Sequence, residues 1–348
     1  MGDGLDAAEA GEFKPAWLAS LAEHGRPDLR RAIWQLVNTL VPYLALWVLM
    51  VILVRRGASY WAVLALAVPA AALLVRVFIF FHDCCHGSFF ASRRANTVLG
   101  YISGILTFTP FDDWRRSHAT HHVTAGDLDR RGIGDVWTMT VDEYLAAPRL
   151  RRLAYRLFRH PAIMFGLGPI GVFLLGQRLA HKGFGKRARL SVLYTNLALL
   201  AIVVAASLTI GLRTYVLIQF PVLFMAGSAG IWLFYVQHQF EGVYWARHEA
   251  WDPIRAALEG SSYYRLPKVL QWLTGNIGLH HIHHLRPRTP NYQLQRTYEA
   301  VPEVRRVEPV TLRSSLKSLR MNLWDEEAQE LISFRALRRR IRQGAPAG

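Results

Sequence analysis

The sequence is poor in cysteine, in acidic residues and in nucleotide-binding motifs. Its two cysteines, Cys84 and Cys85, are adjacent and cannot form an ordinary structural disulfide, which excludes a disulfide-stabilised scaffold. No flavin or dinucleotide fingerprint is present. The segment 1–29 has no apolar core, so we do not expect a signal peptide. Asp and Glu number 25 against 41 Lys and Arg, which leaves a formal net charge of +16.

Apolar sequence, by contrast, is abundant. Hydrophobic residues make up 52% of the 348 residues, and four apolar runs come close to the roughly 20 residues that cross a bilayer as a helix. A basic chain could bind nucleic acid. With such runs present, however, we expect the Lys and Arg to lie on the cytoplasmic side of a membrane, and no nucleic-acid partner. The predicted spans form two helical hairpins, residues 33–54 with 60–81 and residues 190–212 with 214–236.

Three other segments connect these spans. Two apolar runs, 97–111 and 162–176, are short and interrupted by glycine, so we expect them to be interfacial or re-entrant. The polar segment 126–159 is expected to be a solvated loop. All of these segments would be helical or irregular, so the predicted fold class is an all-α integral membrane protein.

Histidines form three clusters with helical spacing. His82 and His86, directly after the second span, are four residues apart and share one helix face. Two further clusters have the spacing i, i+3, i+4; they are His118, His121 and His122, and then His280, His283 and His284. Any one cluster could consist of surface or capping histidines, but three together predict metal binding. His281 is rotated by about 100° from its neighbours and is not expected to be a ligand.

The number of spans decides whether these clusters can meet. If the four long runs cross and the two short ones do not, all three clusters and His238, after the fourth span, lie on one side. If residues 97–111 crossed alone, the first cluster would lie roughly 30 Å from the second. Of the 41 Lys and Arg, 37 lie on the same side as the histidines. Three of the other four lie in the loops on the opposite side, and Arg76 lies within a span, where it can snorkel. The positive-inside rule therefore makes the histidine side cytoplasmic.

Nine imidazoles are too many for one metal ion. A zinc site takes about four ligands and a mononuclear iron site at most about six, so two metals are implied. Imidazole suits zinc, copper, nickel and iron alike, so the ligand type does not choose between them. Iron is favoured because a nitrogen-rich dinuclear site beside membrane helices suits oxygen activation against a hydrocarbon chain.

These clusters resemble the three histidine boxes of the membrane fatty acid desaturases. The matching segments are residues 82–90, residues 118–122, and residues 278–285 followed by Pro290, Asn291 and Tyr292. Residues 126–132 and 238–245 also resemble segments of bacterial and plastid acyl-lipid desaturases that act at the delta-12 or omega-6 position. The likeness runs from about residue 81 to residue 294. The first box has a three-residue gap, which is typical of acyl-lipid and carotenoid members rather than acyl-coenzyme A ones.

The resemblance implies a cytoplasmic helical cap that carries the boxes and a di-iron centre. With O2 as co-substrate, such a centre removes two vicinal hydrogens from an acyl chain, and no catalytic side chain is implied beyond the metal ligands. The family's ligands correspond to His82, His86, His118, His121, His122, His280, His283 and His284, and His238 matches an extra histidine found after the fourth span in relatives.

The resemblance also suggests residues around the metals. Relatives with a known metal geometry have an Asn four residues before the extra histidine; here that position is Phe234, and Asn276 is the candidate replacement. Asp83, Asp113 and Glu241 are candidate acceptors for imidazole N–H groups. For Asp113 and Glu241, charge balance with a nearby Arg is an equal alternative. The candidates for the wall of an acyl channel are Trp114, Trp232 and Trp245.

The expected partners are an acyl lipid and an external electron donor. A ferredoxin or a cytochrome b5 type donor is implied, because the segment after His160 lacks the glycines of the haem motif in desaturases fused to cytochrome b5. The basic surface would suit an acidic ferredoxin and would equally suit anionic lipid headgroups. We expect a bacterial inner membrane, with the active site on its cytoplasmic face. The expected parts are a cytoplasmic segment 1–32, a desaturase domain 33–310 and a basic cytoplasmic tail 311–348.

Two other functions remain open from the sequence. The same scaffold supports hydroxylation or ketolation of lipids and carotenoids. The chain could instead be a membrane metal-binding protein or transporter, although a transporter would carry its ionisable residues within the spans rather than beside them. The position of the double bond, the acyl carrier and the oligomeric state are also open.

Overall fold

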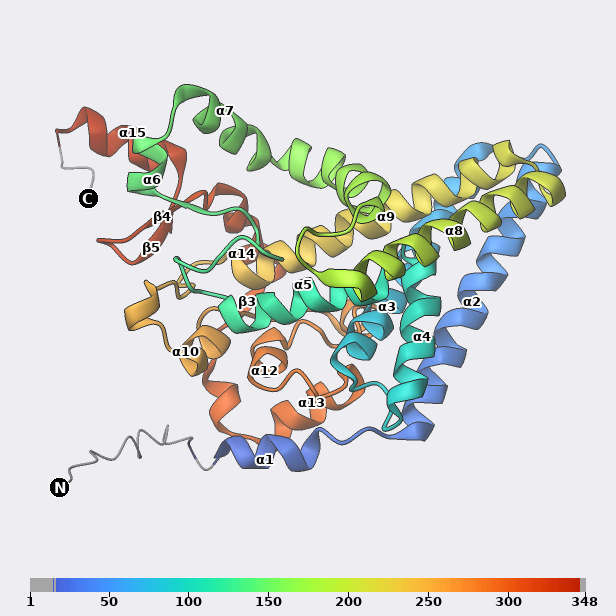
Figure 1. The fold of residues 1–348 in the computed structure, drawn as a ribbon, viewed down its shortest axis with the longest axis horizontal. Helices are drawn as coiled ribbons and strands as arrows, with labels where there is room; N and C mark the ends of the chain where they lie inside the picture. Colours follow the sequence, from blue (N-terminus) through green and yellow to red (C-terminus); the bar gives the residue numbers. More distant parts are fainter. Residues whose placement is uncertain (1–14, 16, 345–348) are drawn as a thin grey trace, which may run out of the picture.

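Four long helices form the centre of the fold. The computed structural model describes residue 15 and residues 17–344; residues 1–14, 16 and 345–348, which belong to the expected N-terminal segment and C-terminal tail, lie outside the described residues. Each long helix is apolar enough to cross a membrane. They are α2 (Leu29–Arg55), α3 (Tyr60–His86), α8 (Gly185–Thr209) and α9 (Leu212–His238). They form two hairpins whose tips lie at the same end of the molecule (Figure 1), so the predicted all-α membrane fold is confirmed.

Local backbone chemistry sets the ends of these helices. The side chain of Asp28 caps α2 by accepting a hydrogen bond from the backbone N–H of Arg31 (3.0 Å). The two hairpin turns contain Gly57 (φ +67°) and Gly211 (φ +88°), a backbone region that glycine adopts without steric cost. Helix α3 is the innermost, since 61% of its apolar window is buried against 17% for α2 and for α8.

The helices that carry histidines extend beyond the predicted spans. The second apolar run ends at Phe81, yet α3 continues to His86 and ends at Gly87 (φ +66°). Helix α9 likewise continues to His238. Backbone hydrogen bonding does not depend on apolar side chains, so a helix does not have to end where the hydrocarbon ends. These histidines are therefore held on helical extensions rather than on loops.

Arg76 does not snorkel to solvent as the sequence suggested. Its side chain is buried, donates a hydrogen bond to Oγ1 of Thr39 (3.0 Å) and another to the backbone carbonyl of Trp272, and lies over the Trp272 ring. A guanidinium group in a hydrophobic interior has to be hydrogen-bonded, and these partners lie closer than water does. Arg76 thereby connects α3 to α2 and to the cap.

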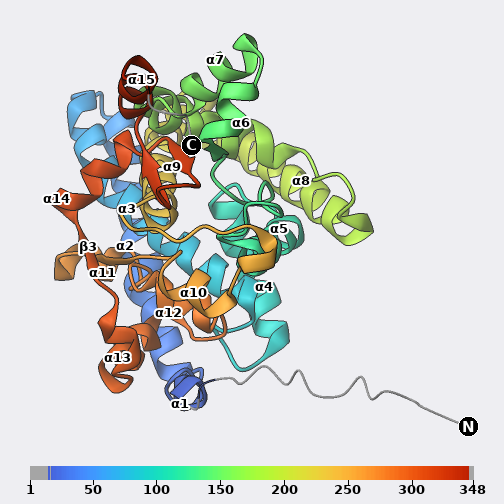
Figure 2. The ribbon, with the colours of Figure 1, turned by 90° about the vertical axis from the view of Figure 1, so that its left-hand side faces the viewer.

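Short helices cover the histidine end of α3 and α9 and form a cap (Figures 1 and 2). Helix α4 packs along α3, and α5 packs against α8. The short apolar run 97–111 is divided between α4 and the start of α5, neither of which is a candidate span. The cap helices are α1 (Trp17–His24), α4 (Arg93–Leu106), α5 (Phe111–Thr124), α10 (Pro253–Leu258), α11 (Lys268–Leu273), α12 (His280–Leu285) and α13 (Asn291–Ala300).

The segment 126–159 is not the simple loop that the sequence predicted. It contains strand β1 (Met139–Thr140) and helices α6 (Val141–Ala146) and α7 (Arg149–Phe158). Thr140 and Glu143 form a capping box that starts α6. The leucines of α7 recur on one helix face, but the many arginines between them made the segment look uniformly polar in the sequence.

The remaining strands and helices complete the cap. Strand β1 runs parallel to β4 (Leu323–Asp325), β4 runs antiparallel to β5 (Glu330–Ile332), and β2 (Tyr263–Arg265) pairs in parallel with β3 (Pro309–Thr311). The C-terminal part adds α14 (Leu312–Ser315) and α15 (Phe334–Arg342). It is anchored by buried apolar side chains such as Trp324 and Leu337. The short 3-10 turns are Gly176–Arg178, His248–Ala250, Glu303–Arg306 and Leu316–Arg320.

The second short apolar run forms two π-helical turns, η1 (Ala162–Leu167) and η2 (Ile170–Leu175). Together with the following turn they make an angle of 65° with α7, and this bent pair would be a fifth span if it crossed as one unit. Three glycines here have the spacing of a dinucleotide motif, but no strand precedes them, so they do not form that fingerprint. The turns pack against α9, where Gly227 leaves room for Phe173 and Pro169.

Candidate metal centre

Nine histidines meet where α3, α5, α9 and α12 converge, and they form two groups. Within each group the nitrogen atoms that could bind a metal all lie within 4.8 Å of one another. The first group is His82, His86, His118, His122 and His283; the second group is His121, His238, His280 and His284. These are the nine histidines that the sequence singled out, and the structure brings all of them together.

The two groups cut across the sequence clusters. On α5, His118 and His122 belong to the first group and His121 to the second. On α12, His283 belongs to the first group, while the other two ligand candidates belong to the second. Around a helix axis, residue i+4 is displaced from residue i by about 40° in one direction, whereas residue i+3 is displaced by about 60° in the other direction. A helix placed between two centres therefore serves both.

The spacing of the ring nitrogens fits metal ions. In the first group, Nε2 of His122 lies 3.1 Å from that of His118 and 3.0 Å from that of His283. In the second group, successive Nε2 separations of 3.1, 3.0 and 3.1 Å join His121, His238, His280 and His284. Two metal–nitrogen bonds of about 2.1 Å at right angles place their nitrogens about 3.0 Å apart, against about 3.4 Å at a tetrahedral angle. The observed spacings match right angles, as in five- or six-coordinate sites.

Burial and mutual repulsion favour the neutral form of five of these rings, on α5 and α12. Burial, reinforced by the neighbouring imidazoles, lowers the pKa of His118 and His122 on α5 well below the usual value. The same causes lower the pKa of His280, His283 and His284 on α12. Neutral imidazole is the form that binds metals.

His281 lies outside both groups, as its helical position predicted. It is fully buried, and its Nε2 lies 3.0 Å from the backbone carbonyl of Val304. Burial lowers the pKa of His281 to about 4. Its role is to pack α12 against the rest of the cap.

A carboxylate meets one histidine of each group at its Nδ1 atom. Asp83 lies 3.2 Å from His82 in the first group, and Asp135 lies 2.6 Å from His121 in the second. Asp83 is the candidate that the sequence suggested. Asp135 was missed, and its only signal was an acidic residue in the glycine-containing turn after the second box. Such contacts fix the orientation of an imidazole that binds a metal through Nε2.

The other candidates for this role have different partners. The carboxylate of Asp113 accepts hydrogen bonds from the backbone N–H (3.0 Å) and Nδ1–H (2.6 Å) of His181. Glu241 is paired with Lys317 at 2.6 Å, and both are exposed. Neither carboxylate hydrogen-bonds to any of the nine histidines. Glu241 thus balances the charge of a nearby cation, which was the alternative to a contact with a histidine. The cation is Lys317 rather than an arginine.

Asn276 acts on the first group only indirectly. Its side-chain amide donates to the backbone carbonyl of Asn291 (3.1 Å), and Asn291 donates two hydrogen bonds to Asp83, from its backbone N–H (2.7 Å) and its side chain (2.8 Å). Phe234, where the resemblance led us to look for an Asn, packs its ring against His121 in the second group (5.3 Å between ring centroids). An apolar ring therefore stands at the position where we expected an amide.

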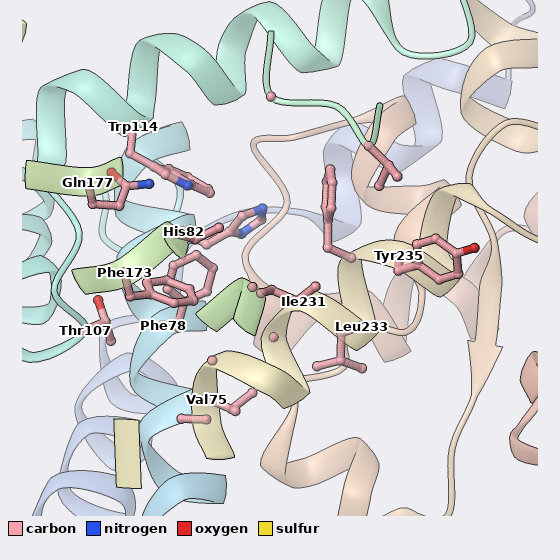
Figure 3. A pocket seen from close by; sticks show the side chains of 18 of the residues that line it. Val75, Phe78, His82, Thr107, Trp114, Phe173, Gln177, Ile231, Leu233 and Tyr235 are labelled. Carbon is pink, nitrogen blue, oxygen red and sulfur yellow. The ribbon is translucent and has the colours of Figure 1, made fainter. Parts of the chain in front are cut away.

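An apolar cavity of about 560 Å³ extends from the histidines between α3 and α9. His82 and His118 of the first group and His280 of the second line it, so both groups border the same space. Figure 3 shows His82 and Trp114 beside Phe78 and Phe173 in this wall. Of the three tryptophans proposed for a channel, Trp114 lines the cavity; Trp232 and Trp245 do not. The cavity has the apolar lining that a hydrocarbon chain requires.

The fold and this site define a membrane protein with two histidine groups that could hold metal ions beside an apolar cavity. A family model described as fatty acid desaturase matches residues 58–314. A fatty acid desaturase of Bacillus subtilis is 48% identical over 318 residues, which cover 91% of this chain and 90% of that protein. The chain therefore belongs to the fatty acid desaturase family and is an oxidoreductase.

More distant relatives carry more specific names. An "sn-1 acyl-lipid omega-3 desaturase (ferredoxin)" of Synechocystis is 27% identical over 66% of this chain and 64% of that protein. A chloroplastic omega-6 fatty acid desaturase of Arabidopsis thaliana is 25% identical over 70% of this chain and 54% of that protein. These names differ in the position of the double bond and agree that a fatty acyl chain is the substrate.

Proposed function

We propose that this desaturase inserts a cis double bond into the acyl chain of a membrane lipid at a di-iron centre. The observation that carries the proposal is the apolar cavity, which has imidazoles of both groups along one end. An acyl chain in this cavity would have its methylene groups next to the metals. Two bound iron ions supply the chemistry that breaks unactivated C–H bonds, with O2 as co-substrate, and O2 takes up the two hydrogens together with two further electrons and protons to give water.

The nine histidines fit such a centre. Five and four imidazoles leave each metal with room for another ligand, since an iron site takes up to about six. We propose that His82, His86, His118, His122 and His283 hold one iron, and that His121, His238, His280 and His284 hold the other. Asp83 and Asp135 would orient one imidazole at each iron.

The electrons come from a separate protein in this proposal. A ferredoxin or cytochrome b5 type donor would approach the cytoplasmic cap, where the net positive charge of the chain favours an acidic partner. The relative named with ferredoxin supports this choice. The proposed location is a bacterial inner membrane, with residues 1–32 and 311–348 on the cytoplasmic side of a desaturase domain 33–310.

For the position of the double bond, the proposal is delta-12 or omega-6. It rests on the likeness of residues 126–132 and 238–245 to acyl-lipid enzymes of that type and on the omega-6 relatives. Relatives named as omega-3 enzymes match as well, so the test has to read the position directly.

The test is expression in a host that lacks polyunsaturated lipids, together with a competent donor. Gas chromatography with mass spectrometry of the fatty acids, after derivatisation of the double bonds, gives the product and its position. We expect a new double bond, which disappears in His283→Ala. A hydroxylated or keto product would favour the alternative activity on this scaffold, and no new product with an active donor would overturn the proposal. Metal transport without any new lipid would favour the non-enzymatic alternative.

A further inference from the structure

The opening of the cavity can be located from residues that both line it and are exposed. Four residues meet both conditions, and three of them, Phe158, Leu167 and Val172, lie on the segment that runs from the end of α7 through the π-helical turns. The fourth is Gly134, in the turn that also carries Asp135. Most of the exposed lining therefore lies along the segment 158–172, which marks the main opening of the cavity.

This opening lies at the depth of the membrane. The π-helical turns pack on α9, where the hydroxyl of Ser228 donates to the backbone carbonyl of Phe165 (2.8 Å) and Gly227 leaves space for Phe173. Gly227 precedes His238 by 11 residues on the same helix, which places it about 16 Å further from the cap at 1.5 Å per residue. The outer faces of Leu167 and Leu175 are exposed and apolar. An exposed apolar wall at this depth faces lipid rather than water.

Helix α7 leads directly to this opening and has the pattern of a helix that lies in a membrane surface. Leu150, Leu153 and Leu157 occupy one face and are exposed, while Tyr155 on the other face is buried in the cap. Arg149 and Arg151 stand about 100° to either side of Leu150. Leucines inserted between arginines that reach the phosphate level are typical of interfacial helices.

The two flanking arginines have no protein partner. Among the described residues, neither Arg149 nor Arg151 forms an ion pair or a side-chain hydrogen bond, and both are exposed. Arg156, two turns after Arg149 on the same flank of the helix, donates instead to the hydroxyl of Tyr144 (2.5 Å). A guanidinium group pairs with a phosphate through two parallel hydrogen bonds. The free arginines are thus available to an anionic headgroup.

We propose that an anionic glycerophospholipid reaches the cavity sideways from the bilayer, with its phosphate bound by Arg151 and its acyl chain passing between Phe158 and Leu167. Arg151 and Phe158 are seven residues apart and share one flank of α7, while Arg149 binds a headgroup on the opposite flank. In this arrangement α7 lies in the membrane surface, and the bent pair of segments is an in-plane helix followed by a re-entrant wall, not a fifth span. Crossing would take the arginines of α7 into hydrocarbon, where charged side chains are costly. The inference rests on the proposed function in one respect, that the substrate is an acyl chain carried by a membrane lipid.

The headgroup part is tested by binding, which does not require activity. The full-length protein in detergent is titrated with phosphatidylglycerol or phosphatidylcholine and examined by native mass spectrometry. We expect phosphatidylglycerol to bind at least severalfold more strongly, and 10 mM inorganic phosphate not to displace it. The double variant Arg149→Gln with Arg151→Gln should lose this preference. The matched control, Arg338→Gln with Arg342→Gln, removes the same charge from exposed positions of the neighbouring α15 and should keep it.

Three results would overturn the headgroup part: equal binding of the two lipids by the wild type, loss of preference in the control pair as well, or displacement by free phosphate. The same variants are then assayed in nanodiscs with a donor. We expect the Arg149 and Arg151 variant to need severalfold more substrate lipid for half-maximal rate, with little change in the maximal rate and in metal content. If the wild type binds phosphatidylglycerol but forms no double bond, the proposed function fails and the headgroup site stands.

The opening is tested with a matched pair of tryptophan substitutions. Leu167 lines the cavity and Leu175, one helical segment later, does not, although both are exposed. Leu167→Trp should narrow the opening and lower the amount of acyl lipid that co-purifies with the protein, measured by methanolysis and gas chromatography. Leu175→Trp should match the wild type. Equal acyl content in all three proteins would place the opening elsewhere.

Discussion

The carboxylate of Asp135 lies 2.6 Å from Nδ1 of His121, although 14 residues separate them. The turn that carries Asp135 is held close to α5. Gly134 has φ +75°, and a Cβ atom there would lie 3.1 Å from Cβ of His121. The backbone N–H of Gly132 donates to the other oxygen of Asp135 (3.1 Å). The turn at Gly134 thus holds the carboxylate of Asp135 against His121, a candidate metal ligand.

Asp135→Asn should weaken metal binding in the second group. An amide oxygen can still accept from Nδ1–H but carries no charge, so we expect the affinity of that group for iron to fall about 10–100-fold. Elemental analysis of the purified protein should approach one iron per chain, with the first group still filled. Asp142→Asn, an exposed acid on α6, is the control and should keep the wild-type content. An unchanged iron content in Asp135→Asn would show that the contact does not support the metal.

The two groups share no histidine, so each should be removable by itself. His238→Ala takes one of four imidazoles from the second group, and His86→Ala takes one of five from the first. We expect each variant to bind metal more weakly in its own group only and to lose desaturation, because the proposed chemistry needs both irons with their full ligand sets. Loss of both metals from either variant would mean that the groups fill only together.

Gly230 is expected to set how far an acyl chain reaches into the cavity. It lines the cavity, and a Cβ atom built there meets nothing within 4 Å, so a side chain would extend into open space. Gly230→Leu should therefore keep the fold and shift the products toward shorter acyl chains. The neighbouring Ala229 is exposed and does not line the cavity, so Ala229→Leu should give the wild-type distribution. The same chain-length profile for both variants would contradict this assignment.

Acid should destabilise the metal-free protein. The pKa values of the α5 and α12 histidines, such as His118 and His283, are lowered by burial in the folded state, whereas unfolding returns them to about 6.5. Below that pH the unfolded chain binds protons that the folded chain does not. The free energy of unfolding therefore includes the full contribution of these neutral histidines above about pH 6.5, and this contribution is lost as the pH falls. The midpoint of thermal unfolding should be lower at pH 5.5 than at pH 7.5. Replacing His280 and His284 by Phe should reduce that difference, and an unchanged difference would assign it to other groups.

Much of the architecture could be predicted because it depends on local patterns. The four long apolar helices, the two hairpins and the shortness of the other two apolar runs follow from the length of apolar runs and from glycine and proline positions. Counting the crossings was enough to predict that His82 and His238 lie on the same side of the membrane. Local patterns were weakest for α7, whose arginines made a packed, half-apolar helix look like a solvated loop.

The functional residues also fall into those that local spacing identified and those that only the packing of distant segments revealed. Helical spacing within the boxes identified His118, His121 and His122, because the i, i+3, i+4 pattern is written into a single segment. It could not assign them to two groups, since that depends on which helices pack on either side of α5. It could not find Asp135 either, because the contact is made by a turn that folds back from outside the helix.

The sequence by itself therefore determined that this is a membrane protein with four long apolar helices and with its histidines gathered at one face, since apolar length and helical periodicity act within a segment. Only the tertiary structure decided that the histidines form one group of five and one of four, that Asp113 and Glu241 pair with His181 and Lys317 instead of the histidine groups, and that the cavity opens beside α7. Those outcomes depend on the packing of segments distant in the chain, and side-chain partners are chosen by distance in space rather than in sequence.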